Sequence, residues 1–188
     1  MHIKSQRYSL SIVLLSLMFS VAAVPLAMAD SLPAGLQTKI DTYKKKLVEW
    51  AANPMFVAAV KESNAKGGLA PGMSNAKWEE LAENDPVVLG FQNSEAGKAV
   101  TQLGQDKGIS KLYLRDEKAN LVASSNKPLL FNNASRPWIA NPLKEGKPWS
   151  AAEVKPDPAT QVKGVHLSVP VLDGGKTIGV LHTSVVAE

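Results

Sequence analysis

Residues 162–186, VKGVHLSVPVLDGGKTIGVLHTSVV, decide the fold of the C-terminal half of this chain. Two runs rich in valine and other strand-forming residues, 162–171 and 176–186, flank the sequence Asp-Gly-Gly at 173–175. An Asp-Gly pair between two such runs is a strong hairpin signal, because glycine adopts positive φ without steric cost. The stretch therefore predicts a long antiparallel β-hairpin.

The predicted hairpin carries two histidines on one face. A three-residue turn pairs Leu172 with Lys176, and this register places His166 directly opposite His182. Such a pair could bind a metal or respond to pH. Two histidines do not complete a zinc site without further ligands, so no metal site is predicted. We expect the pair to form the wall of a polar pocket or a solvated face.

Further strand patterns lie upstream of the hairpin. Residues 109–115 alternate between apolar and polar side chains, residues 116–120 form a polar turn, and residues 121–125 form a second run. Together they predict another β-hairpin. Residues 149–154 are a weak strand candidate, followed by a Pro-Asp-Pro turn signal. Residues 127–147 contain several prolines and asparagines and are predicted to be loop.

The N-terminal half follows a helical period instead. Apolar side chains from Leu36 to Trp50 recur at steps of four and three, which predicts an amphipathic helix. Asn53 and Pro54 then supply an N-cap and a proline at the first helical position, so the long helix is broken there and continues to Lys66. Shorter helices are predicted after the capping residues Ser74, Asp85 and Asn93 or Ser94.

The order of these patterns, helices first and strands second, predicts the α+β class. We expect a long N-terminal helix and short helices, followed by an antiparallel PAS-like sheet of about five strands. One domain is expected over residues 30–188, mainly helical over 30–107 and made of sheet and pocket loops over 108–188. A chain of this length buries a substantial core as a single domain.

Residues 1–29 have the pattern of a secretory signal peptide. Lys4 and Arg7 precede an apolar run over residues 10–24, and Ala-Met-Ala at 27–29 matches the small-x-small cleavage rule. The alternative is an uncleaved membrane anchor, which the short apolar run disfavours. We therefore expect a cleaved signal peptide and a periplasmic mature domain.

Composition excludes several function classes. The chain contains no cysteine, so disulfides, c-type haem attachment, thiolate metal sites and cysteine nucleophiles are ruled out. The formal net charge is +4, but Lys44-Lys45-Lys46 is the only tight basic run, and no nucleic-acid partner is predicted. Gly67-Gly68 follows a predicted helix instead of preceding one, so it is not a phosphate loop. No cofactor is predicted.

Serines in the sheet half are the remaining candidates for catalysis. None lies in a Gly-x-Ser-x-Gly motif, and no local pattern supplies a base with an orienting carboxylate. We therefore predict that the protein is not an enzyme. The alternative is a hydrolase that uses one of the serines Ser124, Ser125, Ser135, Ser168 or Ser184.

The best candidate for binding is the sequence Ser-Arg-Pro-Trp at residues 135–138. Arg136 offers a forked donor for a carboxylate, and Trp138 offers a flat apolar wall. The simpler alternative is that Arg136 is solvated and Trp138 fills the core.

A sheet face is expected to complete this site. Tyr113 and Arg115 share one face of their strand, opposite Leu112 and Leu114. A face bearing Tyr, Ser and His beneath a loop bearing Arg and Trp predicts a concave small-molecule pocket. The alternative is that Tyr113 and Arg115 face outward. The predicted ligand-binding residues are Arg136, Trp138, Tyr113, Ser124, Asp157 and His166.

The sequence resembles a Cache domain, the extracytoplasmic PAS-like sensor module. Residues 108–116 (GISKLYLRD) resemble the first strand and turn of that family, and residues 136–139 (RPWI) resemble its Arg-Pro-Trp-Tyr loop. Residues 169–181 (VPVLDGGKTIGVL) closely resemble its closing hairpin. The resemblance covers essentially the whole mature chain, loosely in the helical half and well from Gly108 onward.

The resemblance implies roles for individual residues. In Cache domains the loop arginine and tryptophan commonly hold a ligand carboxylate, and a later aspartate holds an amino group. By position, Arg136 and Trp138 match the first role and Asp157 matches the second. However, Ile139 replaces the usual tyrosine, and no tyrosine occurs between Trp149 and Asp157. A small carboxylate needs fewer of the missing groups than an amino acid, so a carboxylate is the predicted ligand.

The resemblance also implies a function in signal transduction. We expect a periplasmic sensor that binds a small organic ligand, either a carboxylate or an amino acid. Cache domains usually feed a kinase, cyclase or chemoreceptor module, whereas this sequence stops at Glu188. A stand-alone form that acts through a membrane receptor or kinase is therefore expected. The alternative is an interaction or accessory module with a vestigial pocket, whose N-terminal helix contacts a second copy or a receptor.

Overall fold

A computed structural model describes residues 32–158 and 160–188. The predicted signal peptide, residues 1–29, lies outside the described residues. Among the residues that are described, no helix combines the length and the apolar character needed to cross a membrane.

Helices make up the first half of the domain, as the periodicity predicts. The predicted break in the long helix is confirmed, because Asn53 caps the second helix and Pro54 is its first residue. The N-terminal helices are α1 (Ala34–Ala51), α2 (Pro54–Lys66), α3 (Asn75–Glu80), α4 (Pro86–Asn93) and α5 (Glu95–Leu103). Predicted capping side chains accept main-chain N–H groups at the starts of α2 to α5: Asn53 at 2.9 Å, Ser74 at 3.2 Å, Asp85 at 2.8 Å and Ser94 at 3.0 Å.

The second half forms an antiparallel sheet in the strand order β2-β1-β6-β5-β3, with β4 also paired to β5. The α+β, PAS-like prediction is confirmed, and the described residues give six strands where about five were expected. Of the predicted strand over 149–154, only Trp149–Ser150 is strand, and a second two-residue strand follows at Lys155–Pro156, where Pro156 was predicted to begin a turn. The strands are β1 (Ile109–Asp116), β2 (Leu121–Ser124), β3 (Trp149–Ser150), β4 (Lys155–Pro156), β5 (Lys163–Asp173) and β6 (Lys176–Val186).

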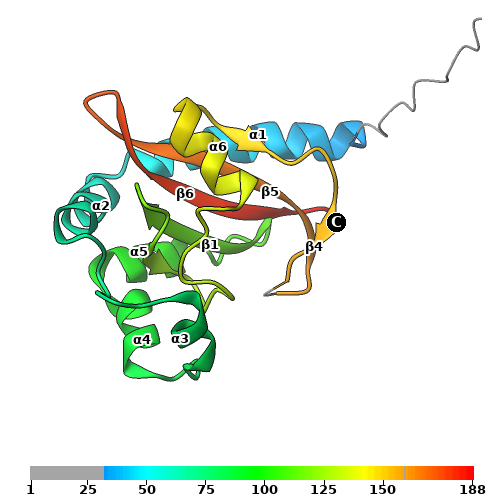
Figure 1. Cartoon of the computed structure of the whole chain (residues 1–188). Helices are drawn as coiled ribbons and strands as arrows, with labels where there is room; N and C mark the ends of the chain where they lie inside the picture. Colours follow the sequence, from blue (N-terminus) through cyan, green and yellow to red (C-terminus); the bar gives the residue numbers. More distant parts are fainter. Residues whose placement is uncertain (1–31, 159) are drawn as a thin grey trace, which may run out of the picture.

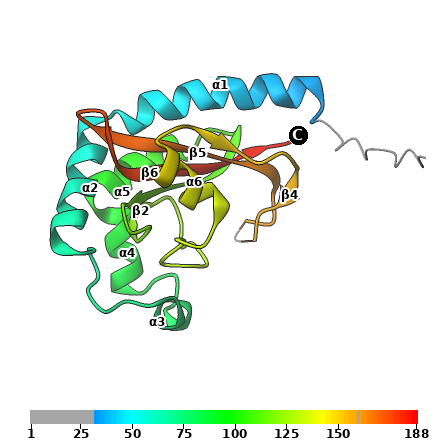
Figure 2. The same ribbon diagram turned by 45° about the horizontal axis from the view of Figure 1, so that its top comes forward.

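The two faces of the sheet are covered by different helices (Figures 1 and 2). Successive residues of a strand point to opposite faces. Leu181 of β6 packs in the main core with Leu47 of α1, whereas its neighbour Val180 packs with Ile139 of helix α6 (Pro137–Glu145). The helices α1 and α6 therefore lie on opposite sides of the sheet.

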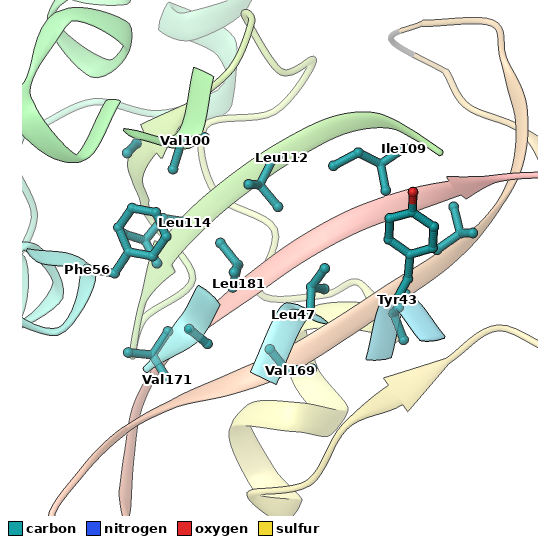
Figure 3. Packing of buried hydrophobic residues seen from close by; sticks show 14 of the residues in the cluster. Tyr43, Leu47, Phe56, Val100, Ile109, Leu112, Leu114, Val169, Val171 and Leu181 are labelled. Atoms are coloured by element: carbon teal, nitrogen blue, oxygen red, sulfur yellow. The ribbon is translucent and has the colours of Figure 1, made fainter. Parts of the chain in front are cut away.

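The main core fills the space between α1, α2, α5 and the sheet. Figure 3 shows Tyr43 and Leu47 of α1 close to side chains of β1, β5 and β6, such as Leu112, Val169 and Leu181. A smaller cluster of aromatic and aliphatic side chains lies under α3 and α4. Its buried members are Trp78, Val88, Phe91, Tyr113, Leu121 and Phe131.

The long hairpin forms as predicted, but its turn is shorter. Asp173 pairs with Lys176, so the turn has two residues, Gly174 and Gly175, with φ values of 57° and 84°. Both angles lie in the region that favours glycine, so two successive glycines allow a two-residue turn here.

The prediction that His166 pairs directly with His182 is therefore wrong. A register shift between Val171 and Leu172 adds to the shorter turn, so that His182 pairs with Ser168 and His166 pairs with Ser184. The two changes together move the pairing by two residues, which keeps both histidines on the same face. They meet diagonally, with 3.1 Å between His166 Nδ1 and His182 Nε2.

The prediction of loop over residues 127–147 is wrong for Pro137–Glu145, which is helix α6. Pro137 occupies the first helical position, where a main-chain N–H is not needed and a fixed φ favours helix. Gly146, at φ 63°, ends the helix in the left-handed conformation. Burial of Ile139 stabilises α6 despite Pro142 inside it. Arg136 and Trp138 thus lie at the start of a helix.

Candidate ligand-binding site

A cavity of about 440 Å³ lies on the face of the sheet that α6 covers. Its volume is within the range of small-molecule pockets. Strands β1, β5 and β6 form its floor, and the start of α6 and the loop after β2 form its walls. The lining residues are Glu79, Lys111, Tyr113, Lys127, Pro128, Leu129, Leu130, Asn133, Arg136, Trp138, Pro158, His166 and His182.

Most of the predicted ligand-binding residues meet in this cavity. Arg136, Trp138, Tyr113 and His166 line it. Asp157 is not a lining residue, but it forms an ion pair with Lys111, which is one. Ser124 is fully buried in β2 opposite Tyr113 and does not line the cavity.

An aromatic stack forms one side of the site. The rings of Trp138 and His166 are parallel within 7°, with 4.2 Å between their centroids. His182 continues the stack, 5.3 Å from His166 and 6.0 Å from Trp138. Trp138 is half-buried and both histidines are buried, so the stack ties the start of α6 to the central hairpin.

Both histidines are neutral at neutral pH. Burial, reinforced by the nearby positive charge of Lys111, lowers the pKa of His166 to about 4. The same causes hold the pKa of His182 well below its usual range, and the neighbouring His166 lowers it further. Protonating either ring would place a cation in a poorly solvated site beside Lys111.

The histidine pair is expected to make the protein less stable in acid. The unfolded chain protonates these histidines near pH 6.5, whereas the folded chain resists protonation down to about pH 4 for His166. The free energy of unfolding should therefore fall as pH decreases through this window, by up to about 1.4 kcal/mol per pH unit for each histidine. Urea denaturation at about pH 7 and pH 5 measures this loss.

The matched control for the acid effect is a double variant, His166→Gln with His182→Gln. Since carboxylates also titrate in acid, only the difference between the two proteins reports on the histidines. The double variant should lose less stability between the two pH values. Equal losses would show that the histidines protonate in the folded protein without penalty.

Lys111 is the main residue of this site that the sequence reasoning missed. Its ammonium group forms an ion pair with Asp157, and the two side chains are only 6% and 0% exposed. Burial lowers the pKa of Lys111, and the charge of Asp157 opposes that shift. Lys111 precedes Tyr113 by two residues, so strand alternation could have placed it on the same face.

Arg115 does not line the cavity, but it is hydrogen-bonded to the loop that forms one of the cavity walls. It is completely buried and donates hydrogen bonds from Nη1 to the carbonyls of Ala119 at 3.1 Å and Phe131 at 2.6 Å, and from Nη2 to that of Leu130 at 3.1 Å. Burial lowers its pKa to about 10, which leaves it positively charged at neutral pH. With Tyr113 also buried, the alternative of outward-facing Tyr113 and Arg115 is wrong.

Arg136 is exposed at the rim of the cavity, with its Cζ 5.7 Å from the centre of the Trp138 ring. Within residues 32–158 and 160–188, its guanidinium group makes no ion pair and no hydrogen bond. It is therefore available to an incoming anion.

Several buried polar atoms on the cavity wall also lack a hydrogen-bond partner among the described residues. They are Trp138 Nε1, His182 Nδ1 and Asn133 Oδ1. Buried polar atoms are normally paired, and an unpaired one is destabilising. A ligand or ordered water is the natural partner for these groups.

The charges around the cavity favour an anion. Lys127 and Arg136 are cationic, Lys111 is paired with Asp157, and Glu79 is the one lining carboxylate among the residues that the structure describes. No group of three or more side chains suited to metal binding occurs in the part of the chain that the structure describes.

Comparisons with known proteins give remote structural similarities. No family model matches the chain, and no curated protein matches it. The chain is similar to the sensor domain of the histidine kinase DctB of V. cholerae, with 17% identity and a TM-score of 0.40, over 81% of this chain and 57% of that one.

Two chemoreceptor domains show similar agreement. One is the ligand-binding domain of the amino acid chemoreceptor PctC of Pseudomonas aeruginosa PAO1 in complex with GABA, with 13% identity, a TM-score of 0.45, and coverage of 82% of this chain and 56% of that one. The other is the ligand-binding domain of chemoreceptor Tlp3 of Campylobacter jejuni in complex with L-valine, with 13% identity, a TM-score of 0.41, and coverage of 82% and 64%. The chain spans less than two thirds of each of these solved chains. All three of these solved chains are sensor or ligand-binding domains.

Proposed function

We propose that residues 30–188 form a periplasmic sensor domain of the Cache type that binds a small carboxylate between the sheet and α6. The observation that carries this proposal is the cavity with a cationic lining and with Arg136 at its rim, whose guanidinium group has no ion-pair or hydrogen-bond partner among the described residues. A guanidinium group binds a carboxylate through two parallel hydrogen bonds. The Arg-Pro-Trp resemblance in the sequence supports the same assignment.

We further propose that the domain binds its ligand without transforming it and signals through a membrane receptor or kinase. Among the described residues, no serine is hydrogen-bonded to a histidine, so the arrangement needed to activate a serine nucleophile is missing. The receptor or kinase partner follows from the Cache resemblance and is tested by co-purification with membrane proteins.

The Arg136→Ala variant is expected to lose most of its affinity for a small carboxylate. Hydrogen bonds to charged groups contribute about 1.5–3 kcal/mol, which corresponds to roughly a 10- to 100-fold weaker dissociation constant. A thermal-shift screen of carboxylates and amino acids identifies the probe, since a ligand at a hundredfold its dissociation constant stabilises by about 2.7 kcal/mol. Isothermal titration calorimetry then compares the variant with the wild type.

Two controls make this test specific. Arg136→Lys keeps the positive charge but loses the planar guanidinium group that can donate two parallel hydrogen bonds. This variant should therefore show an intermediate affinity. Lys45→Ala removes an exposed cation of α1, on the other face of the sheet, and should leave the affinity unchanged. Unchanged affinity in Arg136→Ala would refute the assignment of this residue. A screen without any hit would favour an interaction module with a vestigial pocket.

A further inference from the structure

The ion pair between Lys111 and Asp157 differs from the others in the described part of the chain. Both of its side chains are buried, whereas in every other ion pair each partner is at least 27% exposed. Lys111 lines the cavity, and Asp157 does not. Lys111 thus contributes to the cavity wall, and its ammonium group neutralises a carboxylate that is not part of the lining.

Asp157 also organises the loop that follows it. Its Oδ1 accepts the main-chain N–H of Thr160 at 3.1 Å, and its main-chain N–H donates to the carbonyl of Val162 at 2.9 Å. A buried carboxylate requires a positive partner, because moving an ion out of water costs several kcal/mol. In this protein the partner is supplied by the chain itself, 46 residues away.

This arrangement acts against a second ammonium group in the cavity. A ligand amine would find Asp157 already neutralised by Lys111, and the other charged lining residues are the cations Lys127 and Arg136 against the carboxylate of Glu79. Like charges repel strongly where solvent is largely excluded. The field of Lys111 extends across the site, since it lowers the pKa of both His166 and His182.

We infer that Lys111 determines the specificity of the site: it selects carboxylates that lack an amino group and excludes their amino-acid analogues. This inference rests on the proposed function. It assigns Lys111 the position beside Asp157 that the amino group of a ligand would otherwise take.

The first test compares matched ligands on the wild-type protein and needs no variant. Calorimetry is performed with the pairs propionate and alanine, succinate and aspartate, and butyrate and 4-aminobutyrate. In each pair that binds, the acid without an amino group should bind more tightly, by about tenfold or more for a charge repulsion of this kind. Equal or tighter binding of the amino partner would overturn the inference and leave the carboxylate site intact. Absence of binding in all pairs would count against the proposed function and, with it, this inference.

The second test opens the position of the lysine ammonium group. Lys111→Ala leaves Asp157 without its cation and leaves a hole that n-propylammonium matches in length and charge. We expect n-propylammonium to raise the melting temperature of Lys111→Ala and not that of the wild type. In the same variant, the preference within the ligand pairs should shift toward the amino partner by about tenfold.

Three controls accompany the second test. The neutral alcohol 1-propanol has the same number of heavy atoms as n-propylammonium and should not stabilise Lys111→Ala. Lys111→Met fills the same space without charge, so propylammonium should not stabilise it. Lys127→Ala removes a cation from the same wall without exposing Asp157 and should show no rescue either.

If Lys111→Ala folds and propylammonium has no effect on it, the inference is wrong; if it folds only when propylammonium is present during refolding, the inference is supported. This thermal readout does not depend on carboxylate binding, so its failure is distinguishable from failure of the proposed function.

Discussion

Replacing Arg115 with methionine is expected to lower the free energy of unfolding by roughly 3–5 kcal/mol, because a buried charged hydrogen-bond network is lost. The guanidinium group serves three carbonyls, those of Ala119, Leu130 and Phe131. Each bond to a charged donor contributes about 1.5–3 kcal/mol. Relief from burying a cation offsets part of the loss, since that burial costs several kcal/mol. The carbonyls of Ala119 and Phe131 keep a main-chain donor, but the loss of three charged hydrogen bonds still makes the balance unfavourable.

The same change should disturb the ligand site. Leu130 lines the cavity, and Phe131 packs against Trp78 and Phe91 at centroid distances of 5.6 Å and 5.9 Å. Without Arg115, this segment keeps its aromatic contacts and main-chain hydrogen bonds such as that from Leu121 to Phe131, but loses its charged donor. We therefore expect ligand affinity to fall along with stability, although Arg115 does not line the cavity.

Urea denaturation measures the effect of Arg115→Met, with two variants as controls. Arg115→Lys keeps the charge but lacks the planar guanidinium group that donates hydrogen bonds to three carbonyls. Its loss in free energy of unfolding should therefore be intermediate. Arg136→Met removes an exposed arginine and should change stability by no more than about 0.5 kcal/mol. A loss below about 1 kcal/mol for Arg115→Met would show that packing and the other hydrogen bonds hold the loop without Arg115.

Features that depend on a few neighbouring residues were predicted well from the sequence. The N-caps at Asn53, Ser74 and Asp85 are examples, because a capping side chain bonds to a main-chain group only two or three residues away. The hairpin at residues 173–175 is another, since its glycines favour the turn directly. Side-chain alternation also placed Tyr113 and His166 on the cavity face.

Features that depend on distant contacts were not predicted. The burial of Arg115 requires the carbonyls of residues 130 and 131 to approach β1, and the partner of Lys111 lies 46 residues along the chain. The sequence predicts loop at helix α6 because its prolines indicate a break, while the packing of Ile139 that stabilises the helix is tertiary. The predicted histidine register is wrong because the turn is one residue shorter than expected and because the bulge depends on packing in the whole sheet and has no local signal here.

Close packing explains why a glycine occupies the middle of the Ile-Gly-Val sequence at residues 178–180. Gly179 lies in β6 opposite Asp116 of β1 and Val171 of β5. A Cβ atom at this position would overlap the main-chain carbonyl oxygen of Arg115 and would lie 2.8 Å from Cγ1 of Val60 in α2. Only a residue without a side chain lets α2 approach the β1–β6 pair this closely.

Gly179→Ala is therefore expected to destabilise the protein by about 1–3 kcal/mol, the usual range for overpacking a core, and toward its upper end. The overlapping oxygen belongs to the main chain, so it cannot move without distorting the pairing of β1 with β6.

Urea denaturation measures the effect, and Gly90→Ala is the matched control. Gly90 lies at an exposed position of α4 with no heavy atom within 4 Å of an added Cβ. There the same substitution should stabilise the helix by about 0.5–1 kcal/mol. Equal effects of the two substitutions would mean that β6 accommodates the methyl group by moving as a unit. The opposite signs that we expect would instead show that close packing of α2 against β6 requires glycine at residue 179.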